Sequence, residues 1–266
     1  MNDNVISIYS AIYIKNLVTG QEYSKNQDIS VEGSSTIKIA IVLLTLLKVK
    51  EEGLSLRSKL PIYPRHLSEG SGILNWVNKN NLSIKDYIFY IGRYSDCVAS
   101  NVLVEFLGGK TKVNKILKDM NFKTTLDMDP MNFTNKETVM PKVSTTTAKE
   151  ILNIFIMTLK IIEESKFSSK LIKSLSQIEH FWPSNYLDLS NLGNYKVLAK
   201  TGSITDIGKN KESILNVVGV IKLKNTNIGF SLMNKVSFKT DAIEEDEIEF
   251  KKYIMKNLSE KIEDIY

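Results

Sequence analysis

One stretch of the sequence joins a long apolar run to a lysine at its start. Residues 39–47 are apolar except for Thr45. A run of this length has no polar face and exceeds a typical single strand, which predicts a helix buried on nearly all sides. Because Lys38 directly precedes the run, the sequence places an amine at the edge of a hydrophobic core.

Ser35 and Lys38 are three positions apart, so on a helix they lie one turn apart on one face. Burial disfavours the charged form of a lysine, and a neutral amine accepts a proton from a neighbouring hydroxyl. Ser35 then becomes an activated nucleophile, and a helix N-terminus supplies backbone N–H groups to an oxyanion. The alternative is a serine N-cap before an ordinary buried helix, with Lys38 extended towards solvent.

The composition is that of a soluble globular protein. The chain has 266 residues, 42% hydrophobic and 24% charged, and suits one large domain or two modest ones. Its net charge of +5 is spread without a long basic run, so we expect no nucleic-acid partner. One cysteine, Cys97, excludes an internal disulfide and a cysteine-based metal site. No stretch has the length of a membrane span.

Strand patterns occur at both ends of the chain, and helical patterns lie between them. We expect strands over 5–14, from 22, over 195–200 (with a turn at 201–203), over 214–221 and over 228–233. We expect helices over 83–91, 98–107, 110–120, 146–164, 168–178 and 244–265, with a break at 92–96 and a loop over 121–143. This order predicts an α+β fold in which both chain ends form one antiparallel sheet around a helical insertion.

Three short motifs follow one another along the chain: Ser35-Thr36-Ile37-Lys38, Ser95-Asp96-Cys97 and Lys200-Thr201-Gly202-Ser203. Taken singly, the last two are an ordinary helix cap and a β-turn. Cys97 paired with His66 or His180 would suggest a cysteine hydrolase, although such a cysteine is usually just packed.

In this order and at these separations the motifs resemble S-x-x-K, S-D-N and K-T-G of class A serine β-lactamases and penicillin-binding proteins. Asn101, Gly108-Gly109 and Ser144 to Thr147 look like further landmarks of that family. The resemblance covers most of the chain. It implies a β-lactamase-like fold with a five-stranded antiparallel sheet flanked by helices. Residues 1–33 and 194–266 would form the sheet subdomain and 34–193 the helical subdomain, with the active site at their interface.

The resemblance also implies roles for the motif residues. Ser35 is similar to the nucleophile that accepts the acyl group, Lys38 to its proton acceptor or relay, and Ser95 to the hydroxyl that passes a proton to the leaving nitrogen. Lys200 would polarise Ser95 and bind a substrate carboxylate together with Thr201. Gly202 would admit the ligand to the backbone, and the N–H groups of Ser35 and Ser203 would form the oxyanion hole.

The sequence departs from the family pattern in the second motif and in the loop that serves deacylation. Cys97 replaces the asparagine of S-D-N, whose amide donates to the acylamino carbonyl of the substrate, and a thiol is a weaker donor. In class A enzymes a glutamate in an E-P-x-L-N loop activates the hydrolytic water. Here Asp129-Pro130 resembles that pair with a shorter acid, Glu137 is another carboxylate without a motif, and Ser144 replaces the aspartate of the clamp on this loop.

Three functions follow from this pattern. The first is a β-lactamase that is deacylated through Asp129 or another carboxylate. The second is a penicillin-binding or DD-peptidase-like protein that acylates and releases slowly. The third is a non-enzymatic relic that binds peptidoglycan or protein.

The resemblance calls for no metal and no cofactor, and implies a β-lactam or D-alanyl peptide-like substrate and a monomer. Residues 1–4 lack signal-peptide features. We expect a secreted or cell-envelope protein whose leader is absent from this sequence, with a cytoplasmic location as the alternative.

Overall fold

The computed structural model describes residues 4–68, 70–77, 79–127, 144–176, 185–206, 212–239 and 244–266. The chain divides into two compact units. The sheet unit comprises Met1–Thr36, Thr147–Leu152 and Glu179–Tyr266, and the helical unit comprises Ile37–Thr146 and Asn153–Ile178. Both ends of the chain therefore belong to the sheet unit.

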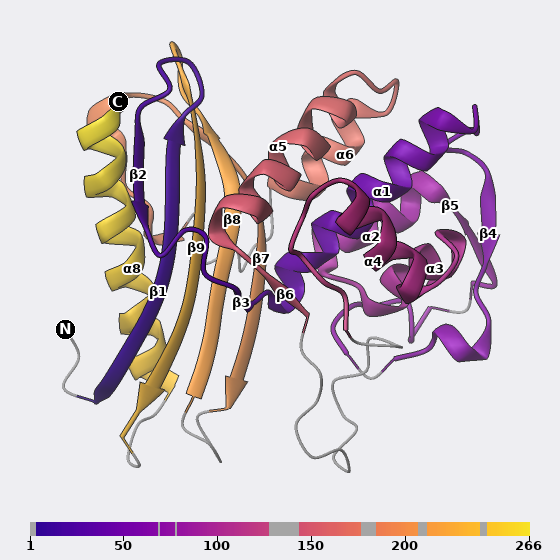
Figure 1. Ribbon diagram of the computed structural model, residues 1–266, viewed down its shortest axis with the longest axis horizontal. Helices are drawn as coiled ribbons and strands as arrows, with labels where there is room; N and C mark the ends of the chain where they lie inside the picture. Colours follow the sequence, from indigo (N-terminus) through magenta and orange to yellow (C-terminus); the bar gives the residue numbers. More distant parts are fainter. Residues whose placement is uncertain are drawn as a thin grey trace. The chain divides into compact units, whose positions relative to one another are not determined.

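The sheet unit contains a five-stranded antiparallel sheet in the order β2-β1-β9-β8-β7 (Figure 1). Its strands are β1 (Val5–Asn16), β2 (Glu22–Lys25), β7 (Lys196–Asp206), β8 (Glu212–Lys222) and β9 (Asn227–Phe238). The predicted α+β class and the predicted sheet from both chain ends are confirmed. Residues 214, 215, 217 and 218 of β8 are all buried, which is why this strand, paired on both edges, shows no alternation of polar and apolar side chains.

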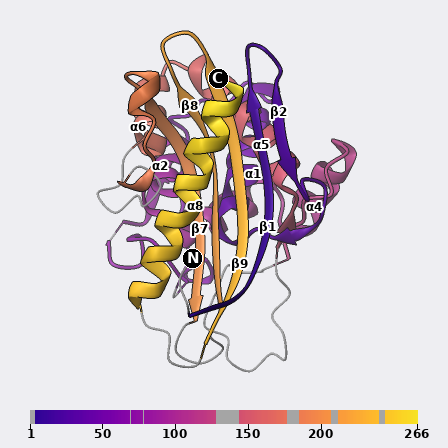
Figure 2. The same ribbon diagram turned by 90° about the vertical axis from the view of Figure 1, so that its left-hand side faces the viewer.

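One long helix, α8 (Glu244–Ile265), lies along a face of this sheet (Figures 1 and 2). Its first turn is acidic from Glu244 to Glu247, and negative charge there suits the helix dipole. Its apolar stripe has helical spacing and consists of Phe250, Ile254, Leu258, Ile262 and Ile265, all buried.

The helical unit contains α1 (Lys38–Glu51), α2 (Ile84–Tyr94), α3 (Cys97–Phe106), α4 (Lys110–Asp119) and α6 (Ser168–Ser176). Helix α5 (Ala148–Glu163) begins in the sheet unit and continues into the helical unit. Shorter elements are β3 (Val31–Glu32), β4 (Lys59–Pro61), β5 (Asn81–Ser83), β6 (Thr145–Thr146), η1 (Ser34–Ile37), η2 (Pro64–His66) and η3 (Ser190–Leu192). Within the described ranges, no helix is long and apolar enough to cross a membrane.

Helix α1 confirms the central prediction from the sequence. Every residue from Lys38 to Leu46 is buried, including Thr45, whose hydroxyl donates to the carbonyl of Ile41 at 2.8 Å. The α-helix begins at Lys38, however, and Ser35 lies in the preceding 3-10 turn, η1. Because the N–H and the hydroxyl of Thr36 both donate to the carbonyl of Gly33, this turn is too tight for an α-helix.

Two local predictions in the helical unit are wrong. Gly92 was expected to interrupt the helix, but α2 runs through to Tyr94. A Cβ at Gly92 would lie 2.4 Å from the hydroxyl oxygen of Ser174, so this glycine permits close packing of α2 and α6. A serine at the start of the predicted helix, Ser83, predicts a side-chain cap for α2, but its hydroxyl donates instead to the carboxylate of Asp86.

Candidate active site

The Lys38 side chain is fully buried in the helical unit. Its Nζ donates to the backbone carbonyl of Ser95 at 2.5 Å and lies 3.3 Å from the Ser95 hydroxyl and 3.2 Å from the Cys97 sulfur. Burial lowers the pKa of Lys38, while interactions with Cys97 and Asp96 act in the opposite direction. The net effect favours the neutral amine, which is the form that accepts a proton.

Ser95, Asp96 and Cys97 form the short connection between α2 and α3. Ser95 ends α2 in the left-handed conformation with φ 53°, and Asp96 is the N-cap of α3. The buried Asp96 carboxylate accepts hydrogen bonds from the backbone N–H groups of Ala99, Ile73 and Leu74 at 2.7–2.9 Å. Asp96 therefore links the start of α3 to the loop at residues 73–74. It thereby holds Ser95 and Cys97 beside Lys38.

Ser71 belongs to the same cluster, and sequence reasoning missed it. Its hydroxyl donates to the carbonyl of Ser95 at 2.8 Å and lies 3.5 Å from Lys38 Nζ. Gly72 allows the loop to pass over Asp96, since a Cβ there would lie 2.2 Å from a carboxylate oxygen and φ is +119°. The glycines at 70 and 72 were the available signal, and they indicated only an irregular connection.

In the sheet unit, Ser35 lies on η1 and is 8% exposed. It follows Ser34, which has φ 46°, a left-handed conformation that costs a non-glycine residue about 1–3 kcal/mol. Such strain is maintained only where the surroundings fix the backbone, and it frequently occurs next to functional groups. Ser35 and Lys38 are the two residues most closely tied to the predicted chemistry. Ser35 is the second-to-last residue of the first segment of the sheet unit, and Lys38 is the second residue of the helical unit.

The Lys200 motif lies inside β7, which corrects the prediction that the strand ends at Thr201-Gly202-Ser203. Pairing with β8 continues from Lys196 to Asp206, with Gly202 opposite Asn216. Lys200 is 2% exposed, and its Nζ donates to the carbonyl of Thr201 at 2.5 Å. The motif therefore belongs to a rigid strand and not to a turn.

Gly202 brings β7 against the backbone of η1, the turn that carries Ser35. A Cβ at this position would lie 2.7 Å from the backbone N of Ser35 and 2.6 Å from that of Thr36. Any side chain would displace one of the two segments. The structure thus brings Ser35 together with the third motif, through Gly202, and brings Lys38 together with the second.

The predicted deacylation carboxylates, Asp129 and Glu137, lie outside the described residues. Hydrogen bonds join residues 125–127 to residues 144–145, on either side of these carboxylates in the sequence, within the helical unit. Thr125 and Thr145 exchange backbone hydrogen bonds of 2.8 and 3.2 Å, and the Ser144 hydroxyl accepts from the N–H of Asp127 at 3.1 Å. Ser144 therefore does bind the loop, through a backbone group and without the charge of an aspartate.

Two other groups of residues do not support a competing site. His66 accepts from the N–H of Tyr63 at 3.0 Å and bonds Glu105 at 2.9 Å, so its ring is engaged away from Cys97. His180 lies outside the described residues.

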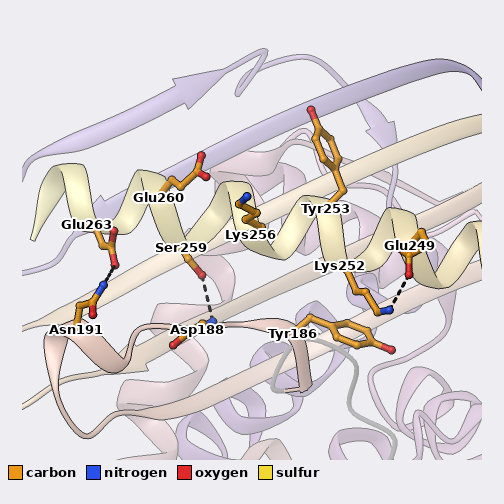
Figure 3. A pocket seen from close by; sticks show the side chains of 10 residues that line it. All are labelled: Tyr186, Asp188, Asn191, Glu249, Lys252, Tyr253, Lys256, Ser259, Glu260 and Glu263. Carbon is orange, nitrogen blue, oxygen red and sulfur yellow. Dashed lines mark hydrogen bonds and ion pairs between the residues drawn. The ribbon is translucent and has the colours of Figure 1, made fainter. Parts of the chain in front are cut away.

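A cavity of about 780 Å³ lies between α8 and residues 186–191 of the sheet unit (Figure 3). Its side chains bond one another, as in the 2.6 Å pair of Lys252 and Glu249, and the described lining includes none of the motif residues.

Comparison with known proteins gives a consistent family. Among curated proteins none matches. The fold is similar to a β-lactamase from Sphaerobacter thermophilus DSM 20745 (17% identity, TM-score 0.66, 86% of this chain and 83% of that chain). It is also similar to PBP-A (17% identity, TM-score 0.70, 97% of this chain and 92% of that chain). A third similar structure is a class A β-lactamase from Mycobacterium abscessus (15% identity, TM-score 0.68, 94% of this chain and 94% of that chain). At these identities the similarity establishes the β-lactamase-like fold. The model of the beta-lactamase enzyme family matches residues 3–247, and the chain therefore belongs to that family.

Proposed function

We propose that this protein is a serine hydrolase that forms an acyl-enzyme at Ser35 and hydrolyses β-lactams. The observation that carries the proposal is the fully buried Lys38 amine, whose pKa is lowered by burial and whose Nζ lies 3.3 Å from the Ser95 hydroxyl. A binding protein gains nothing from such a group, because removing an amine from water costs free energy. A general base requires it.

In the proposed reaction the Ser35 oxygen attacks the lactam carbonyl carbon while its proton passes to the neutral Lys38 amine. The carbon–nitrogen bond of the ring then breaks, and a proton returns from Lys38 through Ser95 to the leaving nitrogen. The product is an ester on Ser35. Water hydrolyses that ester, which restores the Ser35 hydroxyl and releases the ring-opened acid.

The third motif is proposed to bind the substrate. The Lys200 cation and the Thr201 hydroxyl would hold the substrate carboxylate. Gly202 lets β7 approach the Ser35 backbone closely, and the N–H groups of Ser35 and Ser203 would stabilise the oxyanion. One such donor typically contributes about 3–4 kcal/mol to transition-state stabilisation.

A second candidate is a penicillin-binding or DD-peptidase-like protein that holds its acyl group. The shorter acid at Asp129, where class A enzymes have glutamate, favours it. One similar structure is a point mutant of PBP-A, captured as an acyl-enzyme complex with penicillin G. In this candidate Ser35, Lys38 and Ser95 perform the acylation as above, and the ester is long-lived.

Turnover of a chromogenic cephalosporin separates the two candidates. Hydrolysis beyond one equivalent per chain, lost in Ser35→Ala and retained in Ser24→Ala, supports the β-lactamase; Ser24 is an exposed serine on β2. Consumption of a single equivalent of the cephalosporin, with its acyl group retained on the chain, supports the slow-releasing protein. Steady hydrolysis by Ser35→Ala contradicts both.

A further inference from the structure

Asn216 is a buried amide in β8 that lies outside the three motifs. Its side chain is 1% exposed and bridges two backbone groups. Nδ2 donates to the carbonyl of Glu32 at 2.8 Å, and Oδ1 accepts the N–H of Asn234 at 3.0 Å. Because a backbone carbonyl only accepts and a backbone N–H only donates, these partners fix the orientation of the amide. The amide therefore holds a residue that lies three positions before Ser35.

Asn216 and Gly202 hold the two ends of the turn that carries Ser35. They are opposite each other in the register of β7 and β8, and the side chains of opposite residues in an antiparallel pair project from the same face of the sheet. Gly202 lies against the backbone N of Ser35, and Asn216 binds the carbonyl of Glu32. Residues 32–35 are thus fixed to the sheet at both ends.

The turn depends on such anchors because Ser34 does not stabilise its own conformation. Ser34 has φ 46°, in the left-handed region, where a short polar side chain can compensate by bonding locally. Its hydroxyl is buried and, among the residues that the structure describes, has no hydrogen-bond partner. A strained conformation persists only where the surroundings fix it. The bond from Asn216 to Glu32 holds the backbone two residues before Ser34 and supplies one such constraint.

We propose that Asn216 is a positioning residue for the proposed nucleophile: by holding the Glu32 carbonyl on β8, its amide maintains the turn that sets the direction of the Ser35 hydroxyl and N–H. This inference rests on the proposed function of Ser35. Lys200 lies on β7, which is paired with β8 along its length, so loss of the amide should leave the proposed carboxylate site in place. The effect should therefore fall on the rate of acylation and not on the preceding binding step.

Asn216→Leu removes the amide and keeps a side chain of similar size, and Asn16→Leu is its matched control. Asn16 is fully buried at the end of β1 in the same sheet. Its Nδ2 donates to the carbonyl of Ile265 at 3.0 Å, and its Oδ1 accepts the N–H of Val18 at 3.0 Å. Both substitutions leave two backbone groups without their partner, so both variants should unfold at lower urea concentration than wild type.

Stopped-flow acylation by a fluorescent penicillin, at several concentrations, separates positioning from stability. Partial unfolding lowers the number of chains that react, whereas misplacement of Ser35 lowers the rate at which each chain reacts. Asn216→Leu should lose on the order of 10²-fold in the limiting rate, with a half-saturating concentration close to that of wild type. Asn16→Leu should keep the wild-type rate. Equal limiting rates in the two variants, or a loss confined to the amplitude, would overturn the inference.

Hydrogen exchange at the Thr36 N–H, which donates to the carbonyl of Gly33 within the turn, tests the inference without relying on activity. It is followed by NMR on the full-length protein labelled with ¹⁵N-threonine, and the signal is identified by its loss in Thr36→Ser. Exchange should be on the order of 10-fold faster in Asn216→Leu than in Asn16→Leu, the typical effect of one lost hydrogen bond. Equal exchange in the two variants would contradict the proposal.

Asn216→Thr gives the same comparisons if the leucine variant does not fold. Threonine suits a β-strand, and its shorter side chain cannot bridge Glu32 and β9 at once, so slow acylation and fast Thr36 exchange are again expected. Wild-type behaviour of Asn216→Thr in both measurements would refute the inference. A wild-type protein that is not acylated would overturn the proposed function of Ser35, and the exchange measurement would still decide whether Asn216 holds the turn.

Discussion

The Lys38 amine donates to the backbone carbonyl of Ser95 across 2.5 Å in a fully buried site. This contact links the first residue of α1 to the connection between α2 and α3, so the proposed base is positioned by the fold of the helical unit. A backbone acceptor fixes the amine and supplies no counter-charge. Burial lowers the pKa of Lys38 and outweighs the opposing interactions with Cys97 and Asp96, so the neutral form is favoured.

Replacing Lys38 by methionine should stabilise the protein. The pKa of Lys38 is lower in the folded chain than in the unfolded chain, so between these two values the unfolded state binds more protons and stability rises with pH. Below the folded value both states are protonated, and the full cost of burying the charge remains. Lys38→Met removes this dependence and should add about 0.5–2 kcal/mol near neutral pH.

Urea unfolding at several pH values from neutrality to about pH 10 measures this effect. The wild-type stability should rise relative to that of Lys38→Met across this range. Lys118→Met is the control, because Lys118 is exposed on α4, and its stability should parallel that of wild type. A Lys38→Met protein that is less stable than wild type at every pH would refute the prediction.

A side chain at Gly202 should impair acylation. Its Cβ would meet the backbone N of Ser35 at 2.7 Å, and displacement of a nucleophile by about 1 Å costs on the order of 10²-fold in rate. We therefore expect Gly202→Ala to acylate about 10²-fold more slowly than wild type in a stopped-flow assay with a fluorescent penicillin.

Gly229→Ala is the matched control for Gly202→Ala. It lies in the same sheet, but the nearest atoms to its Cβ are side-chain methyl groups of Leu152 and Leu17 at 3.2–3.3 Å, which yield more readily than backbone. Its acylation rate should stay close to that of wild type. Equal rates for Gly202→Ala and wild type would show that the close approach of β7 does not position Ser35.

Asp86 should contribute stability that is lost in acid. Partial burial opposes its ionisation, but hydrogen bonds from Lys170 at 2.6 Å and from Ser83 outweigh this and lower its pKa from 3.8 to about 2. A lowered carboxyl pKa stabilises the folded state above the unfolded pKa, and this contribution fades as pH falls towards the folded value. The stability contributed by Asp86 is therefore lost as the pH falls from about 4 to about 2.

Lys170→Met tests this contribution. It should destabilise the protein by about 1 kcal/mol at neutral pH, as for a partly exposed pair, and the difference from wild type should shrink between about pH 4 and about pH 2 in denaturant unfolding. Lys115→Met removes a more exposed pair with Asp119 and should change stability by less than about 0.5 kcal/mol. A difference between Lys170→Met and wild type that persists unchanged below pH 2 would contradict the assignment.

Hydrophobic periodicity predicted the large elements of the fold correctly. The apolar run after Lys38 and the strand patterns at both ends correspond to α1, β1, β8 and β9, because burial of whole faces determines them. The motif order also predicted the family, which the family model and the fold confirm.

The local predictions failed where a glycine or a hydroxyl serves tertiary packing. Gly92 and Gly202 read as breaks, but each lies inside a regular element and provides room for another segment, Ser174 in one case and the backbone of Ser35 in the other. Ser71 had only the neighbouring glycines as a local signal, and they do not predict its contact with Ser95, which spans 24 residues of sequence. Sequence rules for turns and caps describe neighbours along the chain, whereas these residues are fixed by neighbours in space.

Intact-mass spectrometry after incubation with benzylpenicillin tests the central claim most directly. We predict that the wild-type chain gains the mass of one penicillin molecule, that peptide mapping places it on Ser35, and that Ser35→Ala gains none while Ser24→Ala behaves as wild type. An adduct that persists in Ser35→Ala, or a wild-type chain that stays unmodified and leaves the penicillin intact, would contradict acyl transfer through Ser35.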